Sequence, residues 1–388
     1  MPMGDAGRQT PDRAPSDAAR RTETAIRLGL ALLFLYLFLV GVKSIEEGIS
    51  SFGSDFVDSV FASVANPLAG LAAGVLATVL VQSSSVTTAT IVGLVGSGVL
   101  PVETAVPMVM GANIGTTVTN TLASLGHLRQ GPYFERAFAA ATIHDYFNLI
   151  SVAILLPLEV AFGLVSRIAT WTADTVGDLL PRGGTGSSPI KDAISAPVSW
   201  VEDLISSQGW ETAAGAIFLV LGLGLIFVAL WMITRQMKQV MSGQIENAIN
   251  GILSKGAGLG ALTAGLLMTV AVQSSSITTS ILVPLVAAGV LTLQNAFPVT
   301  LGANIGTTIT AVLASLATDS PDALVIALAH VTFNVLGILI VYPWPRIRAI
   351  PLWLAEKTAE AATRQKSLVA GYVIGLFVLS PLAILLIA

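Results

Sequence analysis

Two short stretches, VQSSSVTT at Val81–Thr88 and VQSSSITT at Val272–Thr279, decide how this chain folds. They are 191 residues apart, and a second pair has the same spacing: GANIGTTVT at Gly111–Thr119 and GANIGTTIT at Gly302–Thr310. Two motifs repeated in one register are the signature of an internal duplication. The chain is therefore predicted to contain two copies of one structural unit.

A third pair of motifs extends each copy toward its C-terminal end. HDYFN at His144–Asn148 matches HVTFN at His330–Asn334, now at a spacing of 186 residues. The change in spacing places a five-residue deletion in the connecting loop of the second copy.

The composition indicates that lipid surrounds most of the chain. Of its 388 residues 54% are hydrophobic and 11% are charged, and its mean hydropathy is +0.80. The charged fraction is less than half of the ~25% usual in soluble domains. Five apolar runs approach the ~20 residues that cross a bilayer: Ala25–Val42, Ala137–Gly163, Thr212–Ile233, Ala323–Tyr342 and Leu368–Ala388.

Several classes of site are disfavoured by the same composition. The chain has no cysteine and three histidines, which excludes disulfides and thiolate metal sites and argues against a transition metal. No cluster of Lys and Arg with interleaved aromatic residues indicates a nucleic-acid partner. The lipid bilayer is the expected environment.

The distribution of positive charge predicts how the copies are oriented, because Lys and Arg collect on the cytoplasmic side of membrane proteins. We assume a cytoplasmic N-terminus and treat each QSSS segment as a re-entrant hairpin. Full spans then lie near residues 25–42, 104–122, 137–163, 212–234, 296–317, 323–342 and 368–388. Of the 19 Lys and Arg residues, 15 fall inside; the four outside are Lys43, Arg167, Arg182 and Lys191.

This topology predicts an all-α polytopic protein of the cell membrane with two inverted-topology repeats, each containing a re-entrant hairpin and a broken transmembrane helix. The predicted segments are a polar cytoplasmic tail (1–22), repeat 1 (23–165, hairpin around 66–100), an external linker (166–211), repeat 2 (212–345, hairpin around 257–291), a cytoplasmic loop (346–366) and a terminal transmembrane helix (367–388). Residues 237–251 look amphipathic and are expected along the cytoplasmic interface.

The two QSSS tetrads are the candidate anion site. A hairpin that turns inside the membrane must place its backbone polar groups against protein or a water-filled cavity. The helix after the turn then offers unpaired N–H groups, a partial positive charge and hydroxyls. Serines that bond back to their own helix are the competing interpretation. The predicted phosphate-binding residues are Gln82, Ser83, Ser84, Ser85, Gln273, Ser274, Ser275 and Ser276.

The GANIGTT motifs are the candidate cation sites, because glycines beside an Asn weaken a helix and free neutral oxygens that suit an alkali ion. The oxygen donors expected there are Asn113, Thr116, Thr117, Asn304, Thr307 and Thr308. Close helix packing through small residues is the alternative. Asp145, beside His144, has Val331 as its counterpart in the second copy; a carboxylate at membrane depth is expected either to hold a cation or to form a structural pair.

The paired motifs, together with ERAFAAATIHDYFNLISVAILLPLE at Glu135–Glu159, resemble the type II sodium–phosphate cotransporters. The resemblance covers nearly all of residues 66–163 and 259–340. It implies that the two hairpins meet near the membrane centre and hold phosphate and sodium, with Gln82 and Gln273 contributing to sodium as well.

The resemblance also assigns Thr121 and Asn148 to a sodium site, and electrogenic relatives have an acid at the position of Asp145. The chain departs from the animal members at His127 and Gln130, where those members carry Gln and Asp, so the composition of that sodium site is left open. The cysteine-containing glycosylated external loop of those members is also missing.

Sodium-coupled import of inorganic phosphate by alternating access is the function predicted from these features, with sodium as the co-transported ion, no other cofactor and no enzymatic activity. The alternatives are transport of another anion such as sulfate or a carboxylate, a passive channel, and an intramembrane hydrolase that uses a serine with His144 and Asp145. Equal duplication of the serines argues against the hydrolase. A homodimer is among the oligomeric states that the sequence allows.

Overall fold

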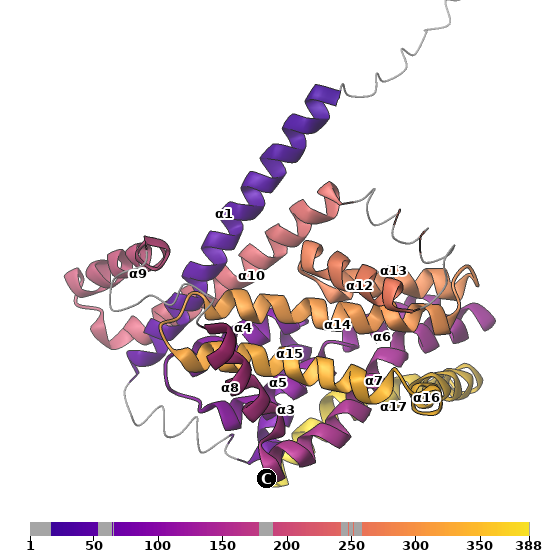
Figure 1. Cartoon of the computed structure of the whole chain (residues 1–388). Coiled ribbons are helices and arrows are strands. Elements are labelled where there is room, and N and C mark those ends of the chain that lie inside the picture. Colours follow the sequence, from indigo (N-terminus) through magenta and orange to yellow (C-terminus); the bar gives the residue numbers. More distant parts are fainter. Residues whose placement is uncertain are drawn as a thin grey trace, which may run out of the picture.

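The described part of the chain is helical throughout. The computed structural model describes residues 17–52, 64, 66–177, 189–241, 247, 251 and 258–387. The helices of the first half are α1 (Asp17–Ser50), α3 (Pro67–Val81), α4 (Ser84–Gly96), α5 (Val102–Gly115), α6 (Val118–Ser124) and α7 (Pro132–Phe162). Those of the second half are α10 (Ala214–Val240), α12 (Leu259–Val272), α13 (Ser275–Ala287), α14 (Leu293–Ser315) and α15 (Pro321–Val341). Between the halves lie α8 (Leu164–Gly177) and α9 (Pro189–Ser207), and after them α16 (Pro345–Arg364), α17 (Ser367–Ile374) and α18 (Ser380–Ile387) (Figure 1).

Within the described residues, six helices are long and apolar enough to cross a membrane: those at Arg21–Ser50, Pro132–Phe162, Glu211–Val240, Leu293–Ser315, Pro321–Val341 and Ser367–Ile387. These correspond to six of the seven spans predicted from the sequence. The segment predicted to span at 104–122 is divided between α5 and α6, so it contains no single helix of sufficient length. The structure thus confirms an all-helical multi-pass membrane protein.

Each QSSS stretch forms the tip of a helical hairpin, α3–α4 in the first half and α12–α13 in the second. The arms have 15, 13, 14 and 13 residues. A helix rises ~1.5 Å per residue, so arms of this length extend roughly 20–22 Å. They are too short to cross the ~30 Å hydrocarbon core.

The broken helix predicted in both copies occurs in only one. In the first copy the α-helix ends at Gly115, and Thr116 and Thr117 form a turn before α6 begins at Val118. In the second copy α14 continues without interruption through Gly302–Thr308. The prediction was wrong for the second copy because an α-helix tolerates glycines where neighbouring helices hold them in place.

Glycines let the hairpin arms pack closely against the following helix in both halves. A Cβ atom on Gly74 would lie 2.0 Å from the carbonyl oxygen of Met108, and one on Gly265 would lie 2.0 Å from that of Val299. The two contacts are related by the 191-residue spacing, so the duplication in sequence is also a duplication of packing. Backbones approach this closely only where no side chain separates them.

The first helices of the two halves, α1 and α10, run antiparallel against each other (Figure 1). A Cβ on Gly222 would lie 2.7 Å from the carbonyl oxygen of Gly41, and a Cβ on Gly215 would lie 2.9 Å from that of Gly48. Along the contact, the residue numbers of α1 therefore increase while those of α10 decrease. At the repeat spacing of 191 residues α10 corresponds to residues 23–49, most of α1, so equivalent helices point in opposite directions.

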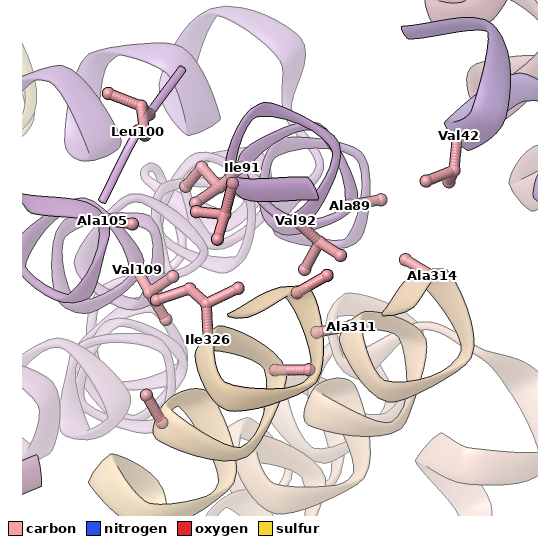
Figure 2. Packing of buried hydrophobic residues seen from close by; sticks show 14 of the residues in the cluster. Val42, Ala89, Ile91, Val92, Leu100, Ala105, Val109, Ala311, Ala314 and Ile326 are labelled. Atoms are coloured by element: carbon pink, nitrogen blue, oxygen red, sulfur yellow. The ribbon is translucent and has the colours of Figure 1, made fainter. Parts of the chain in front are cut away.

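The main hydrophobic core lies where the two halves meet. Ala89 and Val92 of α4 are buried near Ala311 and Ala314 of α14, with Ile326 of α15 beside them (Figure 2). The hairpin of the first half is thus held by helices of the second half. Conversely, hairpin helix α13 of the second half packs against α6 and α7 of the first half.

The segments predicted as a linker and a loop contain helices. Residues 166–211 include most of α8 and all of α9, and residues 346–366 include nearly all of α16. On α9, Lys191 donates to Asp319 at 2.7 Å, and Lys43 donates to the same carboxylate at 3.4 Å. Most of residues 1–22 and of residues 237–251, together with the centre of the linker, lie outside the described residues.

Candidate functional site

Both tetrads turn with the same backbone geometry. Gln82 and Gln273 are the two non-glycine residues of the described part that have positive φ, each at 57°. The next residue in each copy, Ser83 or Ser274, has extended backbone and caps the following helix. Their hydroxyls accept from the backbone N–H of Val86 and of Ile277, at 3.3 and 3.4 Å. A left-handed residue followed by a Ser N-cap therefore ends one arm and starts the other.

The two tips line one pocket of about 260 Å³. All eight predicted phosphate-binding residues contribute to its wall, although the tetrads are 191 residues apart in the chain. Ser84, Ser85 and Ser275 are buried. Since one water occupies ~30 Å³ of liquid, the pocket has room for a small oxyanion and several waters.

Helix α10 closes one side of this pocket, and no residue of this helix was predicted for the site. The α10 residues in the lining are Phe227, Leu230, Trp231 and Thr234. They belong to a strongly apolar run, where nothing distinguishes a pocket wall from a lipid-facing surface. The antiparallel packing of α10 on α1 could not be read from that pattern.

Two threonines outside the predicted set hold the glutamines. The Thr119 hydroxyl donates to Gln82 Oε1 at 3.2 Å, and the Thr310 hydroxyl donates to Gln273 Oε1 at 3.0 Å. Thr310 Oγ1 also lies 3.4 Å from Ser85 Oγ, so it links one tetrad to the other. Both threonines end the repeated GANIGTT[VI]T motif, which was the available signal.

The pocket wall is polar but, among the described residues, uncharged. Its wall contains hydroxyls, amides and apolar groups, and no Lys, Arg, Asp or Glu. The first residues of α4 and α13 lie in this wall, and a helix N-terminus carries a partial positive charge. Of the first-turn N–H groups, those of Val86 and Ile277 donate to the cap serines, and the ones before them have no acceptor within the helix. A neighbouring hollow of about 490 Å³ shares Ser276 with this pocket and is lined by Thr119 and Lys238.

Asp145 lies in a second cluster, fully buried on α7. Its Oδ2 accepts from the Tyr372 hydroxyl at 2.7 Å and from the Thr121 hydroxyl at 3.2 Å. Its Oδ1 has no hydrogen-bond partner among the described residues. The structure therefore brings together two residues predicted for sodium, Asp145 and Thr121, and adds one that was not predicted, Tyr372.

The asparagines form a third buried cluster that joins the halves. Asn304 Nδ2 donates to Asn148 Oδ1 at 2.8 Å, and Asn334 Nδ2 lies 3.3 Å from Asn113 Oδ1. Asn148 Nδ2 also donates to the Asn113 carbonyl at 2.6 Å. His144 Nε2 lies 3.0 Å from Asn304 Oδ1, so this histidine contacts an asparagine of the other half and not Asp145 or a serine.

The remaining predicted threonines bond to their own helices. Thr116 and Thr307 donate to the carbonyls of Ala112 and Ala303, each four residues earlier. Thr117 and Thr308 donate to carbonyls three residues earlier. None of the four lines the pocket shared by the tetrads.

His127 and Gln130 lie in the connection between α6 and α7. The His127 ring packs edge-on against Tyr133, with the centroids 4.9 Å apart. Neither residue lines the tetrad pocket, and neither has a hydrogen bond to the Asp145 carboxylate among those of the described residues.

Comparison with known proteins gives one family. The model of the Na⁺/Pi-cotransporter family matches residues 37–180 and 225–348. Sodium-dependent phosphate transport protein 2A of Oryctolagus cuniculus is 33% identical over 96% of this chain and 69% of its own length. The 2A protein of Ovis aries is 32% identical over 92% of this chain and 67% of its own length. The 2B protein of Homo sapiens is 33% identical over 92% of this chain and 64% of its own length. No solved structure matches the chain.

Proposed function

Because the chain belongs to the Na⁺/Pi-cotransporter family, we propose that it imports inorganic phosphate together with sodium across the cell membrane by alternating access. The observation that carries this proposal is the single pocket formed by both QSSS tetrads. The relatives are named as sodium-dependent phosphate transport proteins, which favours transport over a hydrolase. Neither His144 nor His330 lines the pocket, so its serines have no histidine base there.

Phosphate is assigned to the tetrad pocket. Two helix N-termini and up to six serine hydroxyls surround it, and both features stabilise an oxyanion. Gln82 and Gln273 are held by Thr119 and Thr310, so their amides have defined positions beside the serines. A pre-organised site of this kind binds an anion with little loss of side-chain entropy.

Sodium coupling follows from the charge of the site. A buried anion is costly unless a charge of opposite sign accompanies it. Since the lining contains no Lys or Arg, co-bound cations supply that charge. Each ion then raises the affinity for the other, because binding linkage is reciprocal.

Sodium is assigned to the carboxylate cluster of Asp145 and Thr121 and to the asparagine cluster of Asn113, Asn148 and Asn304. Both provide the oxygen ligands that alkali cations prefer. Thr116, Thr117, Thr307 and Thr308 remain candidate ligands through their oxygens, in addition to the hydrogen bonds that they donate.

Alternating access is supported by the arrangement of the halves. Equivalent helices α1 and α10 run antiparallel, as inverted repeats require. The hollow beside Ser276 extends to Lys238, one of the residues predicted inside, which is consistent with access from the cytoplasmic side in this conformation. We place the N-terminus in the cytoplasm on the basis of the charge distribution.

Phosphate uptake into proteoliposomes tests the proposal. An inward sodium gradient should drive accumulation of radiolabelled phosphate, and a choline gradient should not. Ser84→Ala and Ser275→Ala should each raise the half-saturating phosphate concentration about tenfold, since a hydrogen bond to a charged group contributes ~1.5–3 kcal/mol. Ser97→Ala, at the opposite end of α4, is the matched control and should behave as wild type.

Three outcomes would contradict parts of the proposal. Uptake that is equal in sodium and choline would refute the coupling. Competition by sulfate as strong as that by arsenate would show that phosphate is not the preferred anion. An effect of one serine substitution without the other would refute a site shared by both tetrads.

A further inference from the structure

Tyr372 contacts the site from a helix that belongs to neither repeat. It lies in α17, after α16 and beyond residue 348, where the match to the family model ends. Its hydroxyl donates to Asp145 Oδ2 at 2.7 Å. Helix α17 therefore places a hydrogen-bond donor on Asp145, a buried carboxylate that has no counterpart in the second repeat.

The position of the hydroxyl is fixed by the packing of its ring. The Tyr372 ring has edge-on contacts with Phe138 of α7 and with Phe377, at centroid distances of 5.9 and 6.4 Å. Phe377 is fully buried in the π-helical turn at Gly375–Leu379 that follows α17. An aromatic ring held on two sides loses little further freedom when its hydroxyl bonds to a partner.

The two oxygens of Asp145 have different environments. Oδ2 accepts from two hydroxyls, those of Tyr372 and Thr121, whereas the buried Oδ1 accepts no hydrogen bond from the part of the chain that the structure describes. A buried carboxylate oxygen without a partner is costly, and it indicates a missing ligand. The two donors on Oδ2 hold the carboxylate plane so that Oδ1 stays open.

We propose that Tyr372 is a positioning residue for sodium, because its hydroxyl holds Asp145 Oδ2 and so directs Oδ1 toward the cation. The ring does not itself coordinate the ion. This inference rests on the proposed function and specifies which residue outside the repeats tunes sodium binding at Asp145.

Tyr372→Phe removes the hydroxyl and keeps the ring. In proteoliposomes it should raise the half-saturating sodium concentration about tenfold, because the hydrogen bond lost is one to a charged group. The half-saturating phosphate concentration, measured at saturating sodium, should stay unchanged. Tyr36→Phe is the matched control. The Tyr36 hydroxyl of α1 donates to the carbonyl of Ala193 in α9 at 2.9 Å.

A double substitution separates positioning from general support of the fold. If Tyr372 acts through Asp145, Tyr372→Phe should have no further effect on sodium dependence in an Asp145→Asn background. Sodium-dependent protection against thermal unfolding, measured in detergent without phosphate, gives a readout independent of transport. Tyr372→Phe should reduce that protection, and Tyr36→Phe should not.

The outcomes distinguish this inference from the proposed function. Wild-type protein without sodium-dependent uptake refutes the function itself. Normal wild-type uptake, together with wild-type sodium dependence in both Tyr372→Phe and Tyr36→Phe, refutes only the role of Tyr372. A lower melting temperature that is equal in sodium and in choline, with unchanged sodium dependence, would show that the hydroxyl merely stabilises the fold.

Discussion

Thr310 and Thr119 occupy equivalent positions but have unequal sets of contacts. Thr310 bonds to Gln273 and lies beside Ser85, whereas Thr119 bonds only to Gln82 among the tetrad residues. Removing the Thr310 hydroxyl therefore disturbs both tetrads. Thr310→Val should raise the half-saturating phosphate concentration about tenfold and Thr119→Val about threefold, as expected for two weak hydrogen bonds against one.

The matched control for this pair is Thr300→Val. Thr300 is a buried threonine of α14 whose hydroxyl donates to the carbonyl of Ala296 in its own helix. Concentration dependence of uptake in proteoliposomes is the measurement. Equal effects of the substitutions at Thr119 and Thr310 would contradict the asymmetry seen in the structure.

Repetition made many residues of the site predictable from sequence, although Thr119 and Thr310 were missed and Asp145 was predicted without a counterpart in the second copy. The tetrads, Asn113 and Asn304 are recognisable because each occurs twice in one register, and the structure brings both tetrads into one pocket. Tyr372 has no counterpart in a repeat, and its hydroxyl reaches Asp145 only through tertiary packing. Local sequence carries no information about such a contact.

At the scale of helices, the glycines of the hairpin arms have a strict spatial requirement. A Cβ on Gly265 would lie 2.0 Å from the Val299 carbonyl oxygen, so α12 and α14 must separate to accept it. Gly265→Ala should destabilise the protein by about 2 kcal/mol, the usual cost of overpacking. Gly260→Ala in the same helix, where a Cβ would meet nothing within 4 Å, is the control.

The thermal midpoint in detergent, followed by the fluorescence of the six tryptophans, measures this difference. Gly265→Ala should melt several degrees below wild type. Gly260→Ala should melt at or slightly above the wild-type temperature, since Ala favours a helix over Gly. A similar loss in both variants would contradict the explanation by close packing, because a Cβ on Gly260 meets no neighbouring atom within 4 Å.

Helices α5 and α14 show where local sequence stops being sufficient. GANIGTT is identical in the two copies, yet the helix breaks after Gly115 and continues past Gly306. The motif therefore permits both conformations, and the surrounding helices select one. A break was predicted in each copy because two glycines weaken any helix. The motif does not tell which neighbouring helices keep the second copy continuous.

At the scale of the whole molecule, some contacts between distant segments join residues that are predicted on the same side of the membrane. Lys43 and Lys191, both predicted outside, pair with Asp319, which lies between the predicted spans at 296–317 and 323–342. Arg27 bonds to Gln236 at the other end of α1 and α10, where the residues are predicted inside. Contacts between distant segments thus sort into the same two groups as the positive charges.

The chain has no cysteine, so single introduced cysteines can report its topology without background labelling. Ser207, at the end of α9, and Gln365, just after α16, are both exposed. The predicted topology places Ser207 outside and Gln365 in the cytoplasm. In intact cells a membrane-impermeant maleimide should label Ser207→Cys readily and should label Gln365→Cys only after permeabilisation. Labelling of both from the same side of the intact membrane would contradict the inverted arrangement, because the odd number of crossings predicted between them requires opposite faces.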